Sequence, residues 1–356
     1  MSIDKETVLA ALASVQDPEL KKSLVDLGMI HDIEIAGSAV KVTVALTMAE
    51  CPFKDRLKED VRSAVAAIEG VTEAKVVLTV MTSEERARIF GREPEEMEGI
   101  KEVRNIIAIG SGKGGVGKTT VTVNLAVALH QKGFSVGILD ADMHGPDIPI
   151  MLGISERPLG SGGMLLPLER HGIKVMSTGV LTGEGTPIVW RGPLVNKAIK
   201  EFLGHVLWGK LDFLLVDLPP GTGDAAITVA DAIPLAGVII VTTPQKVSVS
   251  DVRRSIGLFH SKDIPILGII ENMGSMRIRT ADGEIMTIDV FGAGGGEKIA
   301  KAFKVPFLGS IPLDPSIREG GDAGRPPSLN LESDVSRVFH QIVENIIPNP
   351  RIKKTL

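Results

Sequence analysis

Apolar and polar positions in the first part of the chain, residues 1–82, follow two periodicities, one typical of helices and one alternating as in strands. Apolar residues three and four apart indicate amphipathic helices, and alternating or continuous apolar runs indicate strands. Gly37 and Ser38 separate two of the runs and indicate a hairpin. The helices are expected at 7–15 and 53–68, and the strands at 33–35, 40–46 and 71–80. Residues 1–82 are therefore expected to form a small α/β domain.

From residue 104 onward the pattern changes to short apolar runs without alternation, separated by helical stretches. Strands of this kind are typical of a parallel sheet that is buried on both faces. They are expected at 106–109, 135–139, 172–176, 213–216, 237–241, 265–270 and 307–311, and a terminal amphipathic helix that packs on the core is expected at 331–347. We therefore expect a second α/β domain at 104–350, with a mostly parallel sheet covered by helices on both faces. A charged linker is expected at 83–103.

A glycine-rich loop follows the first of these strands and precedes a helical pattern that begins near Val121. Gly112 and Gly117 bracket four residues, and Lys118 and Thr119 complete the pattern G-x-x-x-x-G-K-T. Glycines let backbone N–H groups approach phosphate oxygens, and the helix N-terminus adds partial positive charge. Strand, loop and helix together predict a P-loop NTPase domain that binds a nucleoside triphosphate. The expected binding residues are Gly112, Lys113, Gly114, Gly115, Val116, Gly117, Lys118, Thr119 and Thr120.

Carboxylates end two of the predicted strands, next to the loop. Asp217 ends one strand, where it can hold the water shell of Mg²⁺ together with the Thr119 hydroxyl. Asp140 and Asp142 end another strand. Asp142 lies further out and is the candidate for orienting the attacking water, whereas Asp140 is a candidate for the outer shell of the metal. Lys118 is expected to reach the outer phosphates.

The loop contains a second lysine, Lys113, directly after Gly112. This side chain cannot easily reach the phosphates of its own loop as Lys118 does, but it can reach a nucleotide in a facing subunit. The sequence therefore predicts a homodimer with ATP at its interface, in which Lys113 stabilises transition-state charge as an arginine finger does. Hydrolysis is then expected to require dimerisation.

Composition and charge argue against several classes of partner and location. A net charge of −5 and a pI near 5.9 argue against a nucleic-acid partner or an anionic-membrane surface. The first residues lack the cationic start and apolar core of a signal peptide, and no apolar run approaches the roughly 20 residues of a membrane span. We therefore expect a cytoplasmic protein without membrane insertion.

The single cysteine, Cys51, excludes an internal disulfide. It lies at a predicted strand end, and Pro52 is expected to begin the following helix. A thiol at a helix N-terminus is more reactive because the helix dipole stabilises its thiolate. A buried structural cysteine fits the same position equally well, so the position alone leaves the role of Cys51 open.

The loop with two lysines is that of the deviant P-loop class, which includes the MinD, ParA, nitrogenase-iron-protein and Mrp families. Over nearly its whole length the chain resembles the Mrp/ApbC family of iron–sulfur cluster carrier ATPases. The first domain, with D-P-E-L at 17–20 and C-P at 51–52, resembles the small PaaD-like iron–sulfur assembly domain. The motifs that carry the resemblance in the second domain are L-D-A-D-M-H-G-P-D-I-P (139–149), V-W-R-G-P-L (189–194), V-D-L-P-P-G-T-G-D (216–224), T-T-P-Q (242–245), E-N-M (271–273), F-G-A-G-G-G (291–296) and I-P-L-D-P (311–315).

The resemblance implies a dimeric ATPase that assists the assembly of iron–sulfur clusters or their transfer. Its partners would be iron–sulfur assembly factors or apo-acceptor proteins. The resemblance also implies that Asn272 contacts the adenine and that residues 312–314, with Pro312 and Asp314, line the base pocket.

The chain departs from the family between the E-N-M and F-G-A-G-G-G motifs. There the family typically carries C-x-x-C, so that a symmetric dimer supplies four thiolates to one cluster. Residues 274–290 of this chain contain no cysteine, and Asp282 and Gly283 predict a hairpin turn there. Cys51, in the other domain, is the remaining candidate for a cluster ligand. The expected function is a cluster carrier; the alternative is a nucleotide-gated dimer switch that binds a protein partner without a cluster.

Overall fold

The computed structural model divides into two compact units, Met1–Glu96 and Met97–Leu356. Each unit has a hydrophobic core of its own. The residues described are 3–18, 21–46, 53–81, 97–143, 145–182, 192–221, 223, 226, 229–230 and 233–353.

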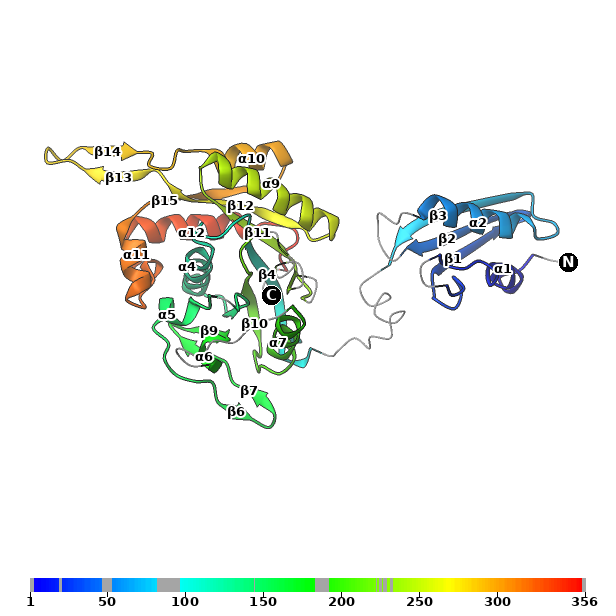
Figure 1. Cartoon of the computed structure of the whole chain (residues 1–356), viewed down its shortest axis with the longest axis horizontal. Coiled ribbons are helices and arrows are strands. Elements are labelled where there is room, and N and C mark those ends of the chain that lie inside the picture. Colours follow the sequence, from blue (N-terminus) through cyan, green and yellow to red (C-terminus); the bar gives the residue numbers. More distant parts are fainter. Residues whose placement is uncertain are drawn as a thin grey trace. The chain divides into compact units, whose positions relative to one another are not determined.

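The first unit consists of a three-stranded sheet and two helices, as its hydrophobic pattern predicts (Figure 1). The elements are α1 Lys5–Leu12, β1 Ile30–Ala36, β2 Ala39–Leu46, α2 Lys54–Ala66 and β3 Glu73–Val80. β2 lies in the middle, antiparallel to β1 and parallel to β3. Leu12, Leu57 and Val61 bury the inner faces of the two helices in the core. Cys51 and Pro52 lie outside the described residues.

The second unit is built on one eight-stranded sheet. Its strands are β4 Val103–Ser111, β5 Val136–Asp140, β8 Leu168–Arg170, β9 Ile173–Ser177, β10 Leu211–Asp217, β11 Gly237–Thr242, β12 Ile266–Gly274 and β15 Phe307–Pro312. Their order is β15-β12-β11-β4-β10-β5-β9-β8, and every neighbouring pair is parallel except β8 with β9. Each strand expected from the apolar runs is present, so the mostly parallel sheet is confirmed.

Helices cover both faces of this sheet (Figure 1). They are α4 Lys118–Gln131, α5 Ile148–Leu152, α6 Gly179–Thr182, α7 Gly192–Gly204, α9 Lys246–Ser261, α10 Gly295–Phe303, α11 Pro315–Asp322 and α12 Asp334–Ile346, with a 3₁₀ turn η2 at Pro327–Leu329. α4 and α12 pack together on one face, and α7 and α9 lie on the other. The strands that lie between β4 and β11 in the sequence are on one side of β4 in the sheet, and the strands from β11 onward are on the other side. Right-handed crossovers in these two directions place helices on opposite faces of the sheet.

Buried polar side chains concentrate where the parallel strands end. In a parallel sheet these carboxyl ends form one edge, which is where ligands bind in open α/β folds. The buried residues at this edge are Ser111, Asp140, Ser177, Asp217, Thr242 and Glu271, each from a different strand. The candidate site is therefore located at this edge before any ligand is considered.

The expected linker needs a correction at its C-terminal end. The structure does not describe residues 82–96, but η1 (Glu98–Ile100) already belongs to the second unit. A Cβ on Gly99 would lie 2.4 Å from the carbonyl oxygen of Val206, and Ile100 is buried in the core. Residues 97–103, expected to be linker, therefore belong to the second unit, against which Gly99 and Ile100 pack.

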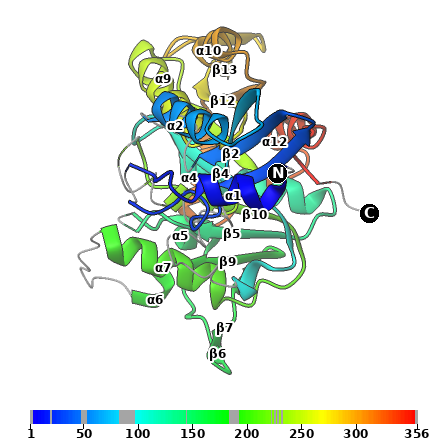
Figure 2. The same ribbon diagram turned by 90° about the vertical axis from the view of Figure 1, so that its right-hand side faces the viewer.

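Two hairpins project from the second unit. The first, β6 Gly160–Ser161 with β7 Met164–Leu165, was not expected from the sequence (Figure 1 and Figure 2). The second, β13 Met276–Arg279 with β14 Ile285–Ile288, confirms the hairpin predicted for 274–290. Gly283 has a φ of 83° in its turn, an angle that side chains other than glycine rarely adopt.

The terminal helix α12 packs on the core, as predicted. Val335, Phe339, Ile342 and Val343 are buried on the side that meets α4 and β15. Among the residues that the structure describes, no helix is both long and apolar enough to cross a membrane.

Phe339→Ala is expected to lower the free energy of unfolding of the second unit by about 3–5 kcal/mol, because the substitution leaves a cavity under α12. Urea unfolding followed by tryptophan fluorescence measures this, since both tryptophans, Trp190 and Trp208, lie in the second unit. Arg337→Ala, on the exposed side of the same helix, is the control and should change stability by less than about 0.5 kcal/mol. Equal effects of the two substitutions would contradict this account of the core.

Candidate nucleotide-binding site

The P-loop connects the end of β4 to the start of α4. Gly117 precedes the helix with a left-handed backbone, at a φ of 79°, and Gly115 has a φ of 76°. Glycine adopts these angles without strain, so the loop can turn back over the helix N-terminus. The first N–H groups of a helix have no partner in its own hydrogen-bond ladder. The loop therefore presents such N–H groups, and the positive end of the helix dipole, to an anion.

Two glycines of the loop are held by close neighbours. A Cβ on Gly112 would lie 2.6 Å from the backbone carbonyl carbon of Asp251 in α9. A Cβ on Gly117 would lie 2.3 Å from the side-chain nitrogen of Asn272, which itself donates a 2.9 Å hydrogen bond to the carbonyl of Val116. The loop is therefore clamped between α9 and the end of β12.

Asp217 is the centre of the polar contacts beneath the loop. Lys118 Nζ lies 2.8 Å from its Oδ2, and the Thr119 hydroxyl donates to the same oxygen over 2.7 Å. The Thr122 hydroxyl donates to Oδ1 over 2.8 Å. The side chains of Lys118 and Asp217 are 6% and 0% exposed, so solvent screens their attraction very little. The P-loop lysine is paired with the carboxylate at the end of β10.

Asp140 lies directly beside Asp217, because β5 and β10 pair in register at these two residues. Its Oδ2 accepts a 2.9 Å hydrogen bond from the Ser177 hydroxyl, and its Oδ1 accepts one of 3.2 Å from the N–H of Asp142. Burial, and then the negative charge of Asp217, raise the pKa of the Asp140 carboxyl well above its ordinary value of 3.8. Two buried carboxyl groups thus share one buried lysine.

The oxygen atoms at this edge fit a magnesium ion. Mg²⁺ prefers oxygen ligands and keeps several waters, so one or two protein groups suffice when phosphate oxygens supply the rest. The Thr119 hydroxyl and the Asp217 carboxylate, 2.7 Å apart, are such groups. Within the described ranges no three His, Cys, Asp or Glu residues cluster as a separate metal site. The donor set therefore suits an ion held jointly with a phosphate.

The two remaining predicted catalytic residues lie at the rim of the site. The carbonyl of Lys113 accepts a 2.9 Å hydrogen bond from the Ser111 hydroxyl, which fixes the backbone at the start of the loop. The Lys113 side chain is partly exposed and forms no ion pair with any residue that the structure describes. Asp142 lies just beyond β5 and is 9% exposed. Lys113 is therefore available to another charge, in contrast to Lys118.

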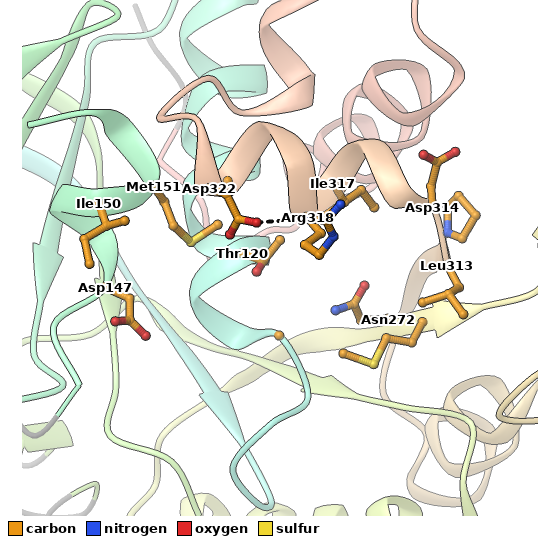
Figure 3. Close-up of a pocket in the computed structure, with 14 residues that line it drawn as sticks. Thr120, Asp147, Ile150, Met151, Asn272, Leu313, Asp314, Ile317, Arg318 and Asp322 are labelled. Atoms are coloured by element: carbon orange, nitrogen blue, oxygen red, sulfur yellow. Dashed lines mark hydrogen bonds and ion pairs between the residues drawn. The ribbon is translucent and has the colours of Figure 1, made fainter.

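A pocket of about 420 Å³ opens beside the P-loop, between the end of β12 and the start of α11 (Figure 3). The Asn272 amide uses its NH₂ group to bond Val116, which leaves its oxygen to accept a hydrogen bond from a ligand. The Asp314 side chain caps the N-terminus of α11. Four residues predicted for the nucleotide line this pocket together with Gly117: Thr120, Asn272, Pro312 and Asp314.

Three further residues of the site are not predicted from the sequence. Thr122 holds Asp217 from the first turns of α4, and its spacing of three from a P-loop threonine on the same helix could have indicated this. Ser177 binds Asp140 from the end of β9, and Arg318 of α11 lines the pocket (Figure 3). No local signal marks these last two, because their roles depend on which strands and helices become neighbours.

Asp140→Asn is expected to stabilise the metal-free and nucleotide-free protein at neutral pH. A carboxyl whose pKa is raised on folding favours the folded state while protonated, and this contribution is lost as the pH rises from the unfolded pKa through the folded one. The melting temperature of the variant relative to wild type should therefore rise as the pH increases above about 4, measured with EDTA present. Asp334→Asn, at an exposed aspartate, is the control. A difference that does not change with pH would contradict the raised pKa.

Two protein families match this chain. The family described as NUBPL iron-transfer P-loop NTPase matches residues 102–347, and the family described as iron-sulfur cluster assembly protein matches residues 5–76. A curated relative named iron-sulfur cluster carrier protein, from Synechocystis sp., is 46% identical over 326 residues, which cover 90% of each chain. A relative of the same name from Methanocaldococcus jannaschii is 49% identical over 261 residues, covering 72% of this chain and 89% of its own.

Solved structures give the same result for the second unit. A nucleotide-binding protein from Archaeoglobus fulgidus, in complex with ADP, is 39% identical with a TM-score of 0.58, covering 69% of this chain and 96% of its own. The septum site-determining protein MinD from Pyrococcus horikoshii, complexed with Mg-ADP, is 26% identical with a TM-score of 0.53, covering 71% of this chain and 99% of its own. The resemblance stated from the motifs is confirmed. The chain belongs to the NUBPL/ParA family of iron-transfer P-loop NTPases and carries an iron–sulfur cluster assembly domain before the NTPase domain.

Proposed function

We propose that this chain is an ATP-binding and ATP-hydrolysing dimer that assists the assembly of iron–sulfur clusters or their transfer to apo-proteins. The observation that carries the proposal is the combination, in one chain, of a complete P-loop with Asp217 beneath it and a matched cluster assembly domain. A relative that aligns with 90% of this chain carries the name iron-sulfur cluster carrier protein. ATP is then the substrate, and the cluster is the cargo.

Binding of ATP begins with an exchange of partners at Lys118. Its ammonium group leaves the Asp217 carboxylate, 2.8 Å away in this structure, and pairs with phosphate oxygens. Asp217 and Thr119 would hold a magnesium ion, which would supply positive charge that offsets the charge of the phosphates. The N–H groups at the start of α4 bind the remaining phosphate oxygens.

Hydrolysis transfers the terminal phosphoryl group to water. The water oxygen bonds to the γ-phosphorus, the bond from this phosphorus to the β–γ bridging oxygen breaks, and ADP and inorganic phosphate are released. Asp142, at the tip of β5, orients the water and accepts its proton. Lys113 of the facing subunit stabilises the charge that develops on the phosphoryl oxygens. What supports this role is that Lys113 is partly exposed and forms no ion pair with the described residues.

The pocket beside the P-loop can bind an adenine through Asn272. One N–H of its NH₂ group is bonded to Val116, and the amide oxygen remains as an acceptor. The amino group at position 6 of an adenine is a donor that matches this oxygen. Pro312 and Asp314 complete the wall on the side of α11.

The cargo has to be bound without a C-x-x-C pair. The sequence contains one cysteine, Cys51, so two subunits supply two thiolates at most. A cluster usually has four protein ligands, so the acceptor protein or an assembly factor contributes the others. The alternative function, a nucleotide-gated switch without a cluster, is favoured by the hairpin that occupies 274–290. A switch of this kind would leave the assembly domain without a role, and we therefore favour the function of a cluster carrier.

Lys113→Ala is expected to lower the rate of ATP hydrolysis by about 10³-fold or more, as the loss of an arginine finger does. It should also abolish nucleotide-dependent dimerisation while leaving nucleotide binding within about twofold, because Lys118 still contacts the phosphates. Phosphate release and light scattering measure the two effects. Lys101→Ala, at an exposed lysine directly after η1, is the control. Unchanged turnover in Lys113→Ala would overturn the shared active site.

Reconstitution with iron and sulfide under anaerobic conditions tests the cargo. Wild-type protein should bind a cluster in the presence of an apo-acceptor and transfer it, and Cys51→Ser should lose most of the transfer because a thiolate ligand is removed. Iron and sulfide content and the visible absorption of the acceptor are the readouts. If the wild-type protein hydrolyses ATP but neither binds nor transfers a cluster, the carrier function is wrong and the nucleotide-gated switch is the better assignment.

A further inference from the structure

The Thr122 hydroxyl is enclosed between two oxygen atoms in the first turns of α4. The side chain is 0% exposed, and its Oγ1 lies 2.8 Å from Asp217 Oδ1 and 3.0 Å from the carbonyl oxygen of Lys118. A hydroxyl has one proton, so it donates to one of these acceptors at a time. The Lys118 carbonyl already receives the N–H of Thr122 in the helix ladder, and a hydrogen bond to a charged group is the stronger one. The hydroxyl therefore donates to Asp217.

α4 also fixes the orientation of this donor. In a helix the threonine side chain is restricted to two main rotamers, and the contact with the Lys118 carbonyl identifies the one that Thr122 adopts. The position of the hydroxyl is therefore set by the helix itself and does not depend on where the Asp217 carboxylate points.

The two oxygens of the Asp217 carboxylate have partners of different kinds. Oδ2 faces the Lys118 ammonium group and the Thr119 hydroxyl, which are expected to contact the phosphates and the metal ion. Oδ1 faces Thr122, which is fully buried and so is not accessible to either ligand. When Lys118 moves to the phosphates, the bond from Thr122 is the one that nucleotide binding leaves in place.

Asp217 needs such a fixed donor because a second carboxyl group lies beside it. Asp140 pairs with Asp217 in register across β5 and β10, and both side chains are fully buried. Two carboxyl groups at one site repel each other when both are ionised. The oxygens of Asp140 already accept hydrogen bonds from the Ser177 hydroxyl and the N–H of Asp142, which hold that side chain in place. Once Lys118 leaves, the bond from α4 keeps the Asp217 carboxylate from turning.

We propose that Thr122 is a positioning residue for the metal ion of the Mg²⁺–nucleotide complex. Its hydroxyl holds Oδ1 of Asp217, so that Oδ2 stays directed toward the Thr119 hydroxyl, 2.7 Å away. The inference rests on the proposed binding of ATP and adds to it a residue that touches neither the nucleotide nor the ion. Groups that orient a metal ligand in this way typically contribute a factor of about 10–100 to metal affinity.

The test measures how far Mg²⁺ strengthens the binding of nucleotide to the full chain. Thr122→Val removes the hydroxyl at nearly constant shape, and Thr122→Ser retains a hydroxyl. A fluorescent ATP analogue is titrated in EDTA and then at increasing Mg²⁺ concentration. The half-saturating Mg²⁺ concentration should rise at least about ten-fold in Thr122→Val and stay within about threefold of wild type in Thr122→Ser. The affinity in EDTA should stay within about twofold in both variants, because Lys118 and the loop N–H groups are unchanged.

Ser336→Ala is the matched control. It removes an equally buried hydroxyl from α12, where that hydroxyl donates a 3.1 Å hydrogen bond to the carbonyl of Ser328. The control should leave the Mg²⁺ dependence of nucleotide binding unchanged, even where it lowers stability. If Thr122→Val does not fold, Thr122→Ala replaces it with the same expected increase in the half-saturating Mg²⁺ concentration.

Three results would overturn the inference, and they differ in what else they remove. An unchanged half-saturating Mg²⁺ concentration in a folded Thr122→Val protein would show that Asp217 is positioned without Thr122. Equal losses of affinity with and without Mg²⁺ would assign Thr122 to the shape of the P-loop instead; in both cases the proposed binding of ATP stands. If the wild-type protein does not bind the analogue at all, the proposed binding of ATP is wrong, and the role of Thr122 fails with it.

Discussion

The buried ion pair between Lys118 and Asp217 is the contact on which the nucleotide site depends. Both side chains are almost fully enclosed, so either one would be left as an uncompensated charge if its partner alone were removed. Lys118 begins α4 and Asp217 ends β10, so the pair also joins the P-loop helix to the sheet. Asp140 is buried beside Asp217 and adds a second carboxyl group. One lysine cannot neutralise both carboxyl groups. Exchange of the lysine for a divalent cation is therefore expected to accompany phosphate binding.

At the carboxyl edge of the sheet, residues of β12 join the P-loop to the start of α10. Asn272 holds the P-loop through Val116, and the preceding residue, Glu271, holds the start of α10. Successive side chains of a strand point to opposite sides, so one strand serves both contacts without competition between them. Glycines are needed wherever these elements approach closely; a Cβ on Gly296 would lie 2.9 Å from that of Glu271. Any change in the loop on nucleotide binding therefore has a short physical path to the hairpin.

Residues 274–290 contain no cysteine pair, so a dimer of this chain cannot supply four thiolates to a cluster from this segment. Apolar side chains occupy the hairpin there, and they favour contact with a protein surface over ligation of a cluster. The NTPase domain and the assembly domain are both present, so in the proposed function the cluster ligands come from the other domain and from partners.

The sequence by itself determined the strands of the second unit, the P-loop and the Asp-Gly hairpin, because glycine spacing and short apolar runs act locally. The positions of Asp217 and Asp140 at strand ends also predict that they belong to the site. Only the tertiary structure decided that these two aspartates are neighbours in register, and that Ser177 completes their contacts. It also decided that Gly99 docks residues expected to be linker. Strand order and helix docking depend on side chains distant in sequence, so no local pattern encodes them.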